Sequence, residues 1–392
     1  MTPHHGAPAD AAGSPDGTGE PAHPGGWRKG DPVAWRKFEQ LGPVSFELGG
    51  TLPEVEIAYE TWGELNDARD NAVFVCHALT GDAHVAGVAA PGQPTPGWWD
   101  GLIGPDCPLD TRDVFVIASN VLGGCQGTTG PSSPAPDGRA YGSRFPHITT
   151  RDQVQVEIAL AERLGIRNFA AVIGGSMGGM RALEWAVMRP DLVTTAVILA
   201  SSPYTTGDQL AWNANQLAAI RSDPDWNGGD YHDTGRPPNA GLGIARSIAH
   251  TTYRSEYELS TRFGRRYQQG ENPLGGNGRF AVESYLDHHR EKLVARFEAS
   301  SYVTLTEAMN AHDIGHGRGG MRAALQRQPV DLRVAAVDSD RLFPPRLSAE
   351  LLAAAGRHPD ELLLIHSAYG HDGFLIEREL VGNFIRSAVA SL

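Results

Sequence analysis

The sequence predicts an α/β fold, in which helices cover both faces of a mostly parallel sheet and an inserted helical lid interrupts the chain. Three observations carry this prediction. Short apolar runs of strand length alternate with helical segments. One of these runs leads directly into a helix through the glycine-rich sequence GGSMG, residues 174–178. The alternation stops after Ser202 and resumes near residue 329, which is typical of an insertion into a single domain.

The chain divides into four segments by composition and pattern. Its 392 residues suffice for one large domain with an insertion. We assign residues 1–33 to a disordered tail, 34–203 to the first part of the core, 204–328 to the helical lid and 329–392 to the second part of the core. The tail is rich in Pro, Gly, Ala, Asp and His with almost no large apolar residue, so it cannot bury enough surface to fold.

Composition excludes several classes of function. The net charge of -13, with no local block of Lys or Arg, argues against a nucleic-acid partner. The apolar runs are too short to span a membrane, and the N-terminus lacks the pattern of a secretory signal, so we expect a cytoplasmic protein. The three cysteines are odd in number and lack C-x-x-C spacing, which predicts reduced, mostly structural thiols and no metal site.

The core elements follow in chain order. Alternating residues in VSFELG (44–49) and EVEIAYETWG (54–63) predict an antiparallel hairpin. A helix is expected after Thr150, which forms a capping-box pattern with Gln153, and it should end near Gly165. Runs that indicate further strands are AVFVCHAL from Ala72, DVFVIASN from Asp113, FAAVIGG from Phe169, TTAVILAS from Thr194, DLRVAAVDSD from Asp331 and ELLLIHSAYGHD from Glu361.

Ser176 is the candidate nucleophile. It is the serine of a Gly-x-Ser-x-Gly sequence with a buried strand before it and a segment of strong helix formers after it, the context of a nucleophile elbow. Gly174 and Gly178 would let neighbouring backbone approach the strained turn. The N–H of Met177, at the start of the helix, is a candidate oxyanion donor. Together these features predict the α/β-hydrolase fold and acyl transfer through Ser176.

A serine nucleophile needs a histidine base and a carboxylate that orients it. In this fold the carboxylate and then the histidine follow the serine along the chain, at the ends of late strands. Asp338 and Asp340 both follow one apolar strand, and the pattern does not choose between them. His366 and His371 follow the next strand. We favour His371 because it lies in a glycine-flanked loop, whereas His366 directly follows a run of leucines.

The second oxyanion donor is expected in the loop after an early strand. The segment FVCHALTGDAH, residues 74–84, occupies that place, and the backbone N–H of Leu79 is the candidate. The alternative interpretation is an ordinary turn between a strand and a loop.

Several longer segments together resemble one known family, the homoserine O-acetyltransferases, which are α/β-hydrolase-fold acyltransferases of methionine biosynthesis. The likeness extends over nearly all of the chain after the tail. The segments that carry it are AYETWGELN (58–66), CHALTGDAHVAG (76–87), GWWDGLIGP (97–105), SNVLGGCQGTTGPSS (119–133), YGSRFPHITTRD (141–152), GGSMGGMRALEW (174–185), DPDWNGGDY (223–231), SDRLFPP (339–345) and YGHDGFL (369–375).

The resemblance implies roles that the pattern leaves open. It implies the triad Ser176, Asp340 and His371, with acetyl-CoA as co-substrate, an acetyl-serine intermediate and L-homoserine as acceptor. No tightly bound cofactor and no metal are then required. It also implies that Arg246 binds the carboxylate of the amino acid and that Asp372 binds its ammonium group.

Tyr253 resembles a further pocket residue of the family. Without the family, Arg246 and Tyr253 could equally be surface residues of one helix. Related enzymes use serine, succinyl-CoA or a secondary-metabolite hydroxyl, and an ester hydrolase or an inactive binding protein could share the fold. The resemblance also suggests a homodimer formed through the lid.

Overall fold

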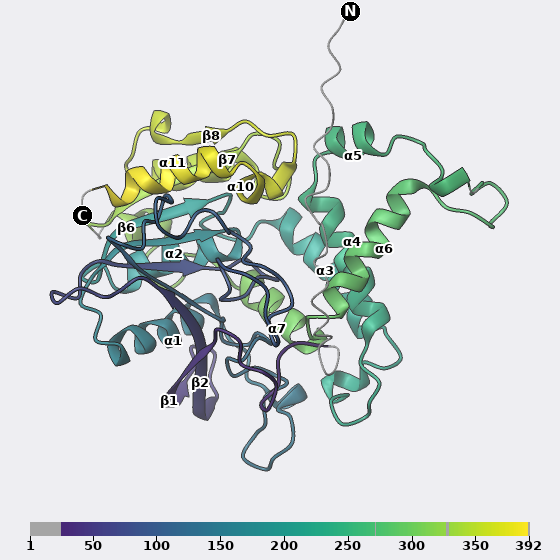
Figure 1. The fold of residues 1–392 in the computed structure, drawn as a ribbon, viewed down its shortest axis with the longest axis horizontal. Coiled ribbons are helices and arrows are strands. Elements are labelled where there is room, and N and C mark those ends of the chain that lie inside the picture. The colour runs from purple at the N-terminus through teal and green to yellow at the C-terminus, as the bar shows by residue number, and fades with distance from the viewer. Residues whose placement is uncertain (1–24, 271, 327–328, 391–392) are drawn as a thin grey trace, which may run out of the picture.

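The computed structural model describes residues 25–270, 272–326 and 329–390. Within them, one sheet of eight strands has the order β1-β2-β4-β3-β5-β6-β7-β8 (Figure 1). The strands are β1 (Lys37–Ser45), β2 (Thr51–Trp62), β3 (Ala72–Cys76), β4 (Phe115–Ser119), β5 (Phe169–Gly175), β6 (Val193–Leu199), β7 (Asp331–Val337) and β8 (Leu363–Ile365). Pairings β1–β2 and β2–β4 are antiparallel and the others are parallel, so the predicted mostly parallel sheet is confirmed.

The central strands are buried on both faces, as their continuous apolar sequences require. All residues of β3 and β5 are buried. The predicted hairpin is present as β1 and β2, but β1 begins at Lys37, before the VSFELG run. The ladder ends at Ser45 and Thr51, because Glu47 to Gly50 form the turn between the two strands.

Helices cover both faces of the sheet. Those of the core are α1 (Thr150–Arg163), α2 (Met177–Met188), α9 (Pro345–Ala354), α10 (Gly373–Ile376) and α11 (Arg378–Val389). Helices α1, α2 and α9 share one apolar cluster with the sheet, and α11 packs into a second cluster with the other set of strand side chains. Helix α1 is capped by Thr149 with Asp152, one residue before the predicted pair, because the Thr149 side chain accepts from the Asp152 N–H.

In the described residues between β6 and β7, where the sequence places the lid, there are six α-helices. They are α3 (Gly207–Arg221), α4 (Asn239–Tyr253), α5 (Glu256–Arg262), α6 (Ala281–Val294), α7 (Ala299–Asn310) and α8 (Met321–Leu325). Helix α4 packs against both α3 and α6, and these three stand beside the sheet (Figure 1). The assigned end of the lid, residue 328, lies outside the described residues.

The assigned N-terminal tail lies outside the described residues as far as residue 24. Residues 25–33 instead lie against the core. The Trp27 N–H donates to the carbonyl of Cys125 at 2.9 Å, and its ring centroid is 5.1 Å from that of Phe38. None of the helices in the described part of the chain has the length and apolarity that crossing a membrane requires.

Candidate active site

Ser176 stands at the turn between β5 and α2. Its backbone has φ 57° and ψ -127°, a left-handed conformation that non-glycine residues rarely adopt and that is typical of strained functional positions. The Ser176 N–H donates to the Leu199 carbonyl at 3.0 Å, and its carbonyl accepts from the Ser201 hydroxyl at 2.7 Å. These bonds tie the strained turn to β6 and the loop after it, so the serine is presented at the carboxyl edge of the sheet.

Glycines allow this turn to pack. A Cβ at Gly174 would lie 2.0 Å from the Gly178 carbonyl oxygen, and a Cβ at Gly178 would lie 2.1 Å from the Cys76 carbonyl oxygen. Both distances are impossible for real atoms, so no larger residue fits at either position without backbone movement. The first turn of α2 is therefore pressed directly against the end of β3.

His371 and Asp340 form a buried pair at the ends of the two strands that follow the lid. His371 Nδ1 is 2.6 Å from Asp340 Oδ2, and each residue is 3% exposed. Asp340 Oδ1 accepts the backbone N–H groups of Leu342 and Phe343, both at 2.8 Å. Burial by itself would lower the pKa of His371, but the charge and hydrogen bond of Asp340, helped by Asp372, raise it above its ordinary value.

A second Asp–His pair is made of Asp338, which the sequence pattern left open, and His366, which it disfavoured. His366 Nδ1 is 2.9 Å from Asp338 Oδ2, but the His366 side chain is 78% exposed. The structure thus separates the four candidates into one buried pair and one surface pair. Only His371 is in ring contact with residues of the Ser176 site.

Two phenylalanines bring His371 and Ser176 together. Phe343 stacks on His371 with ring centroids 5.0 Å apart, and Phe374 meets His371 edge-on at 5.5 Å. Phe374 also packs against Gly175, where an added Cβ would lie 2.3 Å from the ring. Among the described residues, Ser176 Oγ makes no hydrogen bond to His371; such bonds are often long in enzymes without substrate.

The loop after β3 carries Leu79, the predicted oxyanion donor. Leu79 and Ser176 line the same cavity of about 20 Å³, which also contacts Tyr253 and Phe343. The other predicted donor, Met177, is fully buried at the first position of α2. The structure therefore brings both candidate donors beside the nucleophile.

Arg181, which was not among the predicted site residues, supports the start of this loop. It lies fully buried on α2, forms an ion pair with Glu157 on α1, and donates from Nη2 to the His77 carbonyl at 2.6 Å. Burial and the charge of Arg181 lower the pKa of His77 to about 3. The neutral ring accepts the Val121 N–H at Nε2, so Nδ1 carries the proton and donates to the Ala78 carbonyl. The available signal was an arginine in a helix whose other residues, apart from Glu184, are apolar or glycine.

Arg296, from the segment between α6 and α7, holds the same loop from the lid side. Its Nη1 donates to the Thr80 carbonyl at 2.7 Å and its Nη2 lies 2.8 Å from Asp82 Oδ2. Burial would raise the pKa of Asp82, but Arg296 and Arg36 lower it. The loop that carries Leu79 is thus held by the fully buried Arg181 of the core and the partly buried Arg296 of the lid.

The three predicted substrate residues gather near His371. The Arg246 guanidinium lies 5.6 Å from the Tyr253 ring centroid, and that ring is 5.8 Å from the ring of His371. Asp372 follows His371, but Arg254 Nε already lies 3.1 Å from its Oδ2. Burial raises the pKa of Asp372 while Arg254 opposes the shift. No pattern in the sequence predicted that Arg254 would be this partner.

Polar residues of α3 form another part of the cavity wall that the sequence did not predict. Gln209, Asn213 and Gln216 line the cavity with Ser176. Gln209 is fixed twice, since it completes the capping box of α3 and donates to the Leu342 carbonyl at 2.9 Å. The wall opposite the nucleophile is therefore polar and held in place.

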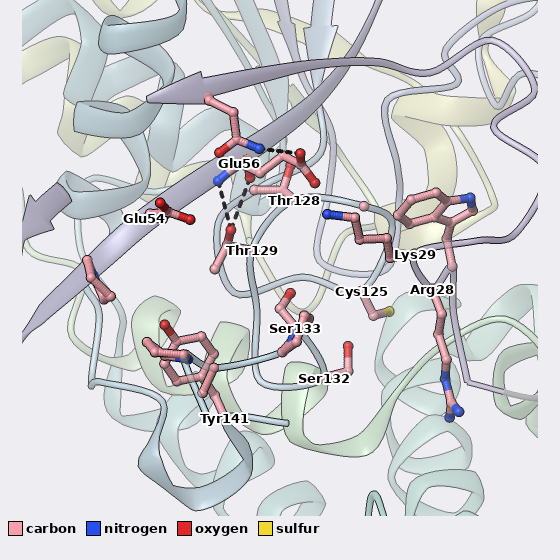
Figure 2. A pocket seen from close by; sticks show the side chains of 17 residues that line it. Arg28, Lys29, Glu54, Glu56, Cys125, Thr128, Thr129, Ser132, Ser133 and Tyr141 are labelled. Carbon is pink, nitrogen blue, oxygen red and sulfur yellow. Dashed lines mark hydrogen bonds between the residues drawn. The ribbon is translucent and has the colours of Figure 1, made fainter. Parts of the chain in front are cut away.

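A larger cavity, of about 660 Å³, lies elsewhere (Figure 2). Its wall carries Arg28 and Lys29 as well as Glu54 and Glu56, so the charges are of both signs. None of the triad residues lines it. Volume alone would thus point away from the nucleophile.

Comparisons with known proteins agree with this geometry. A family model described as "alpha/beta hydrolase fold" matches residues 71–377. The homoserine O-acetyltransferase of Thermobifida fusca is 57% identical over 368 residues, covering 93% of this chain and 97% of that protein. Among solved structures, the homoserine O-acetyltransferase from Bacillus anthracis has a TM-score of 0.81 at 28% identity, covering 90% of this chain and 97% of that one. Esterase E22 has a TM-score of 0.82 at 26% identity, covering 90% and 99%.

Proposed function

This chain belongs to the homoserine O-acetyltransferases, a family with the α/β-hydrolase fold, and we propose that Ser176 carries an acetyl group from acetyl-CoA to the hydroxyl of L-homoserine. The observation that carries the proposal is the strained serine at the elbow beside a buried His371–Asp340 pair. A serine that is both strained and adjacent to an oriented imidazole is suited to nucleophilic acyl transfer.

The first half-reaction acetylates the serine. His371 removes the proton of Ser176 Oγ as the oxygen attacks the thioester carbon of acetyl-CoA, and the backbone N–H groups of Leu79 and Met177 bind the resulting oxyanion. Collapse of the tetrahedral intermediate breaks the C–S bond. The departing thiolate takes the proton from His371, which leaves CoA and an acetyl ester on Ser176. Asp340 orients the imidazole and stabilises its cation throughout.

The second half-reaction transfers the acetyl group. His371 removes the proton of the homoserine hydroxyl, whose oxygen attacks the acetyl carbon and forms a second oxyanion at the same donors. Collapse breaks the bond to Ser176 Oγ, which recovers its proton from His371. The products are O-acetylhomoserine and free enzyme. Water must be excluded, since it would otherwise hydrolyse the acetyl-enzyme, and the small cavity over Ser176 supports such exclusion.

Selection of a zwitterionic acceptor would use the charges around Tyr253. The Arg246 guanidinium suits a carboxylate, which it can bind through two parallel hydrogen bonds. Arg254 contacts Asp372 at Oδ2, so Oδ1 is the oxygen for the ammonium group of homoserine. In this arrangement Arg254 stabilises the buried Asp372 carboxylate before substrate binds.

The decisive experiment measures CoA release from acetyl-CoA by the purified protein with and without homoserine. Release that depends on homoserine, with O-acetylhomoserine found by mass spectrometry, is the expected result, and Ser176→Ala should lose it by about 10⁴–10⁶-fold. Release that ignores homoserine would make the protein an ester hydrolase. The same assay with L-serine as acceptor, and with succinyl-CoA as donor, tests the alternative substrates of related acyltransferases.

We also infer a cytoplasmic homodimer formed through the lid. Large apolar side chains of three lid helices are exposed, namely Leu210 on α3, Ile244 on α4 and Tyr257 on α5. Two copies could cover these side chains by a two-fold contact. Cys76, Cys107 and Cys125 are free thiols, which fits a reducing compartment. Analytical ultracentrifugation should give a dimer that Ile244→Glu dissociates; a monomeric parent protein would contradict this.

A further inference from the structure

A group of basic and imidazole side chains lies where α4 and α6 pack side by side in the lid (Figure 1). We call Arg246, His250, His288, His289 and Lys292 the basic cluster. The rings of His250 and His289 stack with centroids 3.9 Å apart, and that of His288 lies 5.4 Å from His289. Lys292 and His288 are exposed to solvent, whereas His250 is 4% exposed. The cluster therefore runs from the interior of the lid to its surface.

Among the described residues, no carboxylate forms an ion pair with a side chain of the basic cluster, although the charge of Arg246 acts on Asp372. Arg246 donates only to the Thr80 hydroxyl, and Lys292 makes no hydrogen bond or ion pair in the ranges that the structure describes. Of the nearby acids on α6, Asp287 is held by Arg279 and Arg290. Glu283 accepts the Phe280 N–H at the start of the helix. Glu291 is adjacent to Lys292 in sequence and so faces another direction, but it lies three residues after His288 and is a neighbour of that ring. In a chain of net charge -13, the cluster is a local excess of positive charge, and its exposed end at Lys292 is unpaired among the described residues.

The imidazoles respond to this excess charge. Burial and the neighbouring cations, Arg246 first among them, lower the pKa of His289 to about 3. The Nε2 atom of buried His250 has no hydrogen-bond partner in the described residues. A bound anion would pair with the cations and offer hydrogen bonds to these nitrogens. The cluster thus has both the charge and the unpaired buried atom of an anion site.

The basic cluster is continuous with the candidate active site. The His250 ring lies 5.6 Å from that of Tyr253, which lies 5.8 Å from that of His371. Arg246 stands between the two regions, because its guanidinium lies over Tyr253 while its charge acts on His250 and His289. An extended ligand could therefore react at Ser176 and still place an anionic end at His289 and Lys292.

We propose that the outer part of the basic cluster, formed by Lys292, His288 and His289, binds the phosphate groups of the acyl-CoA donor. The inference rests on the proposed function, since it assigns the remote end of the thioester substrate used at Ser176. The donor carries its phosphates at the far end of a flexible arm, as this placement requires. Arg246 keeps its role toward the carboxylate of the acceptor, on the Tyr253 side of the cluster.

The test compares two donors, acetyl-CoA and S-acetyl-N-acetylcysteamine, a thioester without phosphates. Lys292→Ala and His288→Ala should each raise KM for acetyl-CoA by about 10-fold, the order of one charge-assisted hydrogen bond, and leave KM for the truncated thioester unchanged. Both positions are exposed, so the fold should be retained. Arg322→Ala, an exposed cation on α8, is the matched control and should change neither KM.

Direct binding separates this proposal from the proposed function. Calorimetry on Ser176→Ala protein should give tighter binding for CoA than for 3′-dephospho-CoA or pantetheine, and Lys292→Ala should reduce that difference. If wild-type protein acetylates homoserine but Lys292→Ala leaves both the acetyl-CoA KM and CoA binding unchanged, the phosphate site is refuted while the function stands. If neither thioester acetylates homoserine, the function itself fails, and undiminished binding of CoA to Lys292→Ala then refutes the phosphate site independently.

Discussion

The core and the lid contribute to the site in different ways. In the core, Ser176, His371 and Asp340 are fixed by strand ends, by backbone hydrogen bonds and by close packing of glycines and phenylalanines. In the lid, Arg246 and Arg296 reach the site as long charged side chains from helices and loops far along the chain. In the proposed mechanism, rigid local geometry therefore positions the reacting groups, whereas recognition of the acceptor would depend on charges that the lid brings to the core.

The largest expected effect is in the core, at the buried carboxylate. Asp340→Asn removes the charge that stabilises the His371 cation and should lower kcat/KM by about 10⁴-fold. Asp338→Asn is a matched control two residues away, because Asp338 contacts exposed His366 and the Ser367 N–H and not His371; it should leave kcat/KM unchanged. Steady-state kinetics with homoserine and acetyl-CoA would measure both, and equal losses in the two variants would contradict the assignment of the triad.

The pH profile sharpens the same contrast. Because the pKa of His371 is raised, kcat/KM should fall as the pH drops through a value above the ordinary 6.5, where the base becomes protonated. Asp340→Asn removes the interaction that raises the pKa of His371. The residual kcat/KM of this variant should therefore begin to fall only at a lower pH than in the wild type. A fall at the same pH in both would show that another group controls the profile.

A stability measurement tests the buried Arg181–Glu157 ion pair behind the core site. Arg181→Ala leaves Glu157 as an uncompensated buried carboxylate and should lower the free energy of unfolding by about 3–5 kcal/mol. Arg189→Ala, near the end of the same helix, breaks ion pairs with exposed acids and should cost less than about 1 kcal/mol. Urea denaturation measures both, and similar costs would mean that burial does not distinguish the two arginines.

Sequence reasoning succeeded where the signal is local. The elbow was predictable because strand, glycines, serine and helix are contiguous, and the fold class follows from continuous apolar strands. The choice between Asp338 and Asp340 was not predictable from pattern, since both follow β7. In the structure the chain turns after β7, where the Asp340 N–H donates to the Val337 carbonyl, and the two side chains then meet different histidines.

Charge pairs between residues far apart in the chain could not be predicted, for a different reason. Arg296 contacts Thr80 and Asp82, which lie 216 and 214 positions earlier in the chain. Arg254 meets Asp372 only because α4 packs against the loop after β8. No periodicity or spacing relates such residues, so a sequence indicates that charges are present without indicating which of them meet.

The third prediction is in the lid and should affect recognition alone. Arg246→Ala should raise KM for homoserine by about 10–100-fold, the cost of losing a charge-assisted contact with its carboxylate. The rate at which acetyl-CoA acetylates Ser176, followed by mass spectrometry without acceptor, should be unchanged. Arg265→Ala, an exposed lid arginine over Phe280, is the control and should leave the homoserine KM alone. A loss of acetylation rate in Arg246→Ala would mean that the lid also takes part in the chemistry.

The smallest expected effect lies at the boundary itself, where Arg296 joins the lid to the loop of Leu79. Arg296→Gln removes the ion pair with Asp82 and at least one bond to the Thr80 carbonyl. Loss of an entire oxyanion donor costs about 10²–10³-fold in kcat, so displacement of the donor should cost less, about 10-fold. Arg36 still acts on Asp82, which limits the disturbance of the loop.

Both half-reactions use the same oxyanion donors, so Arg296→Gln should slow the acetylation of Ser176 and the transfer to homoserine by the same factor. The homoserine KM should be unchanged in Arg296→Gln, whereas it should rise in Arg246→Ala, a variant of the proposed acceptor site. Arg296→Lys keeps the charge near Asp82 and should recover part of the rate. If Arg296→Gln instead raised the homoserine KM and left the rate of Ser176 acetylation unchanged, Arg296 would act in acceptor recognition and not in support of the oxyanion donors.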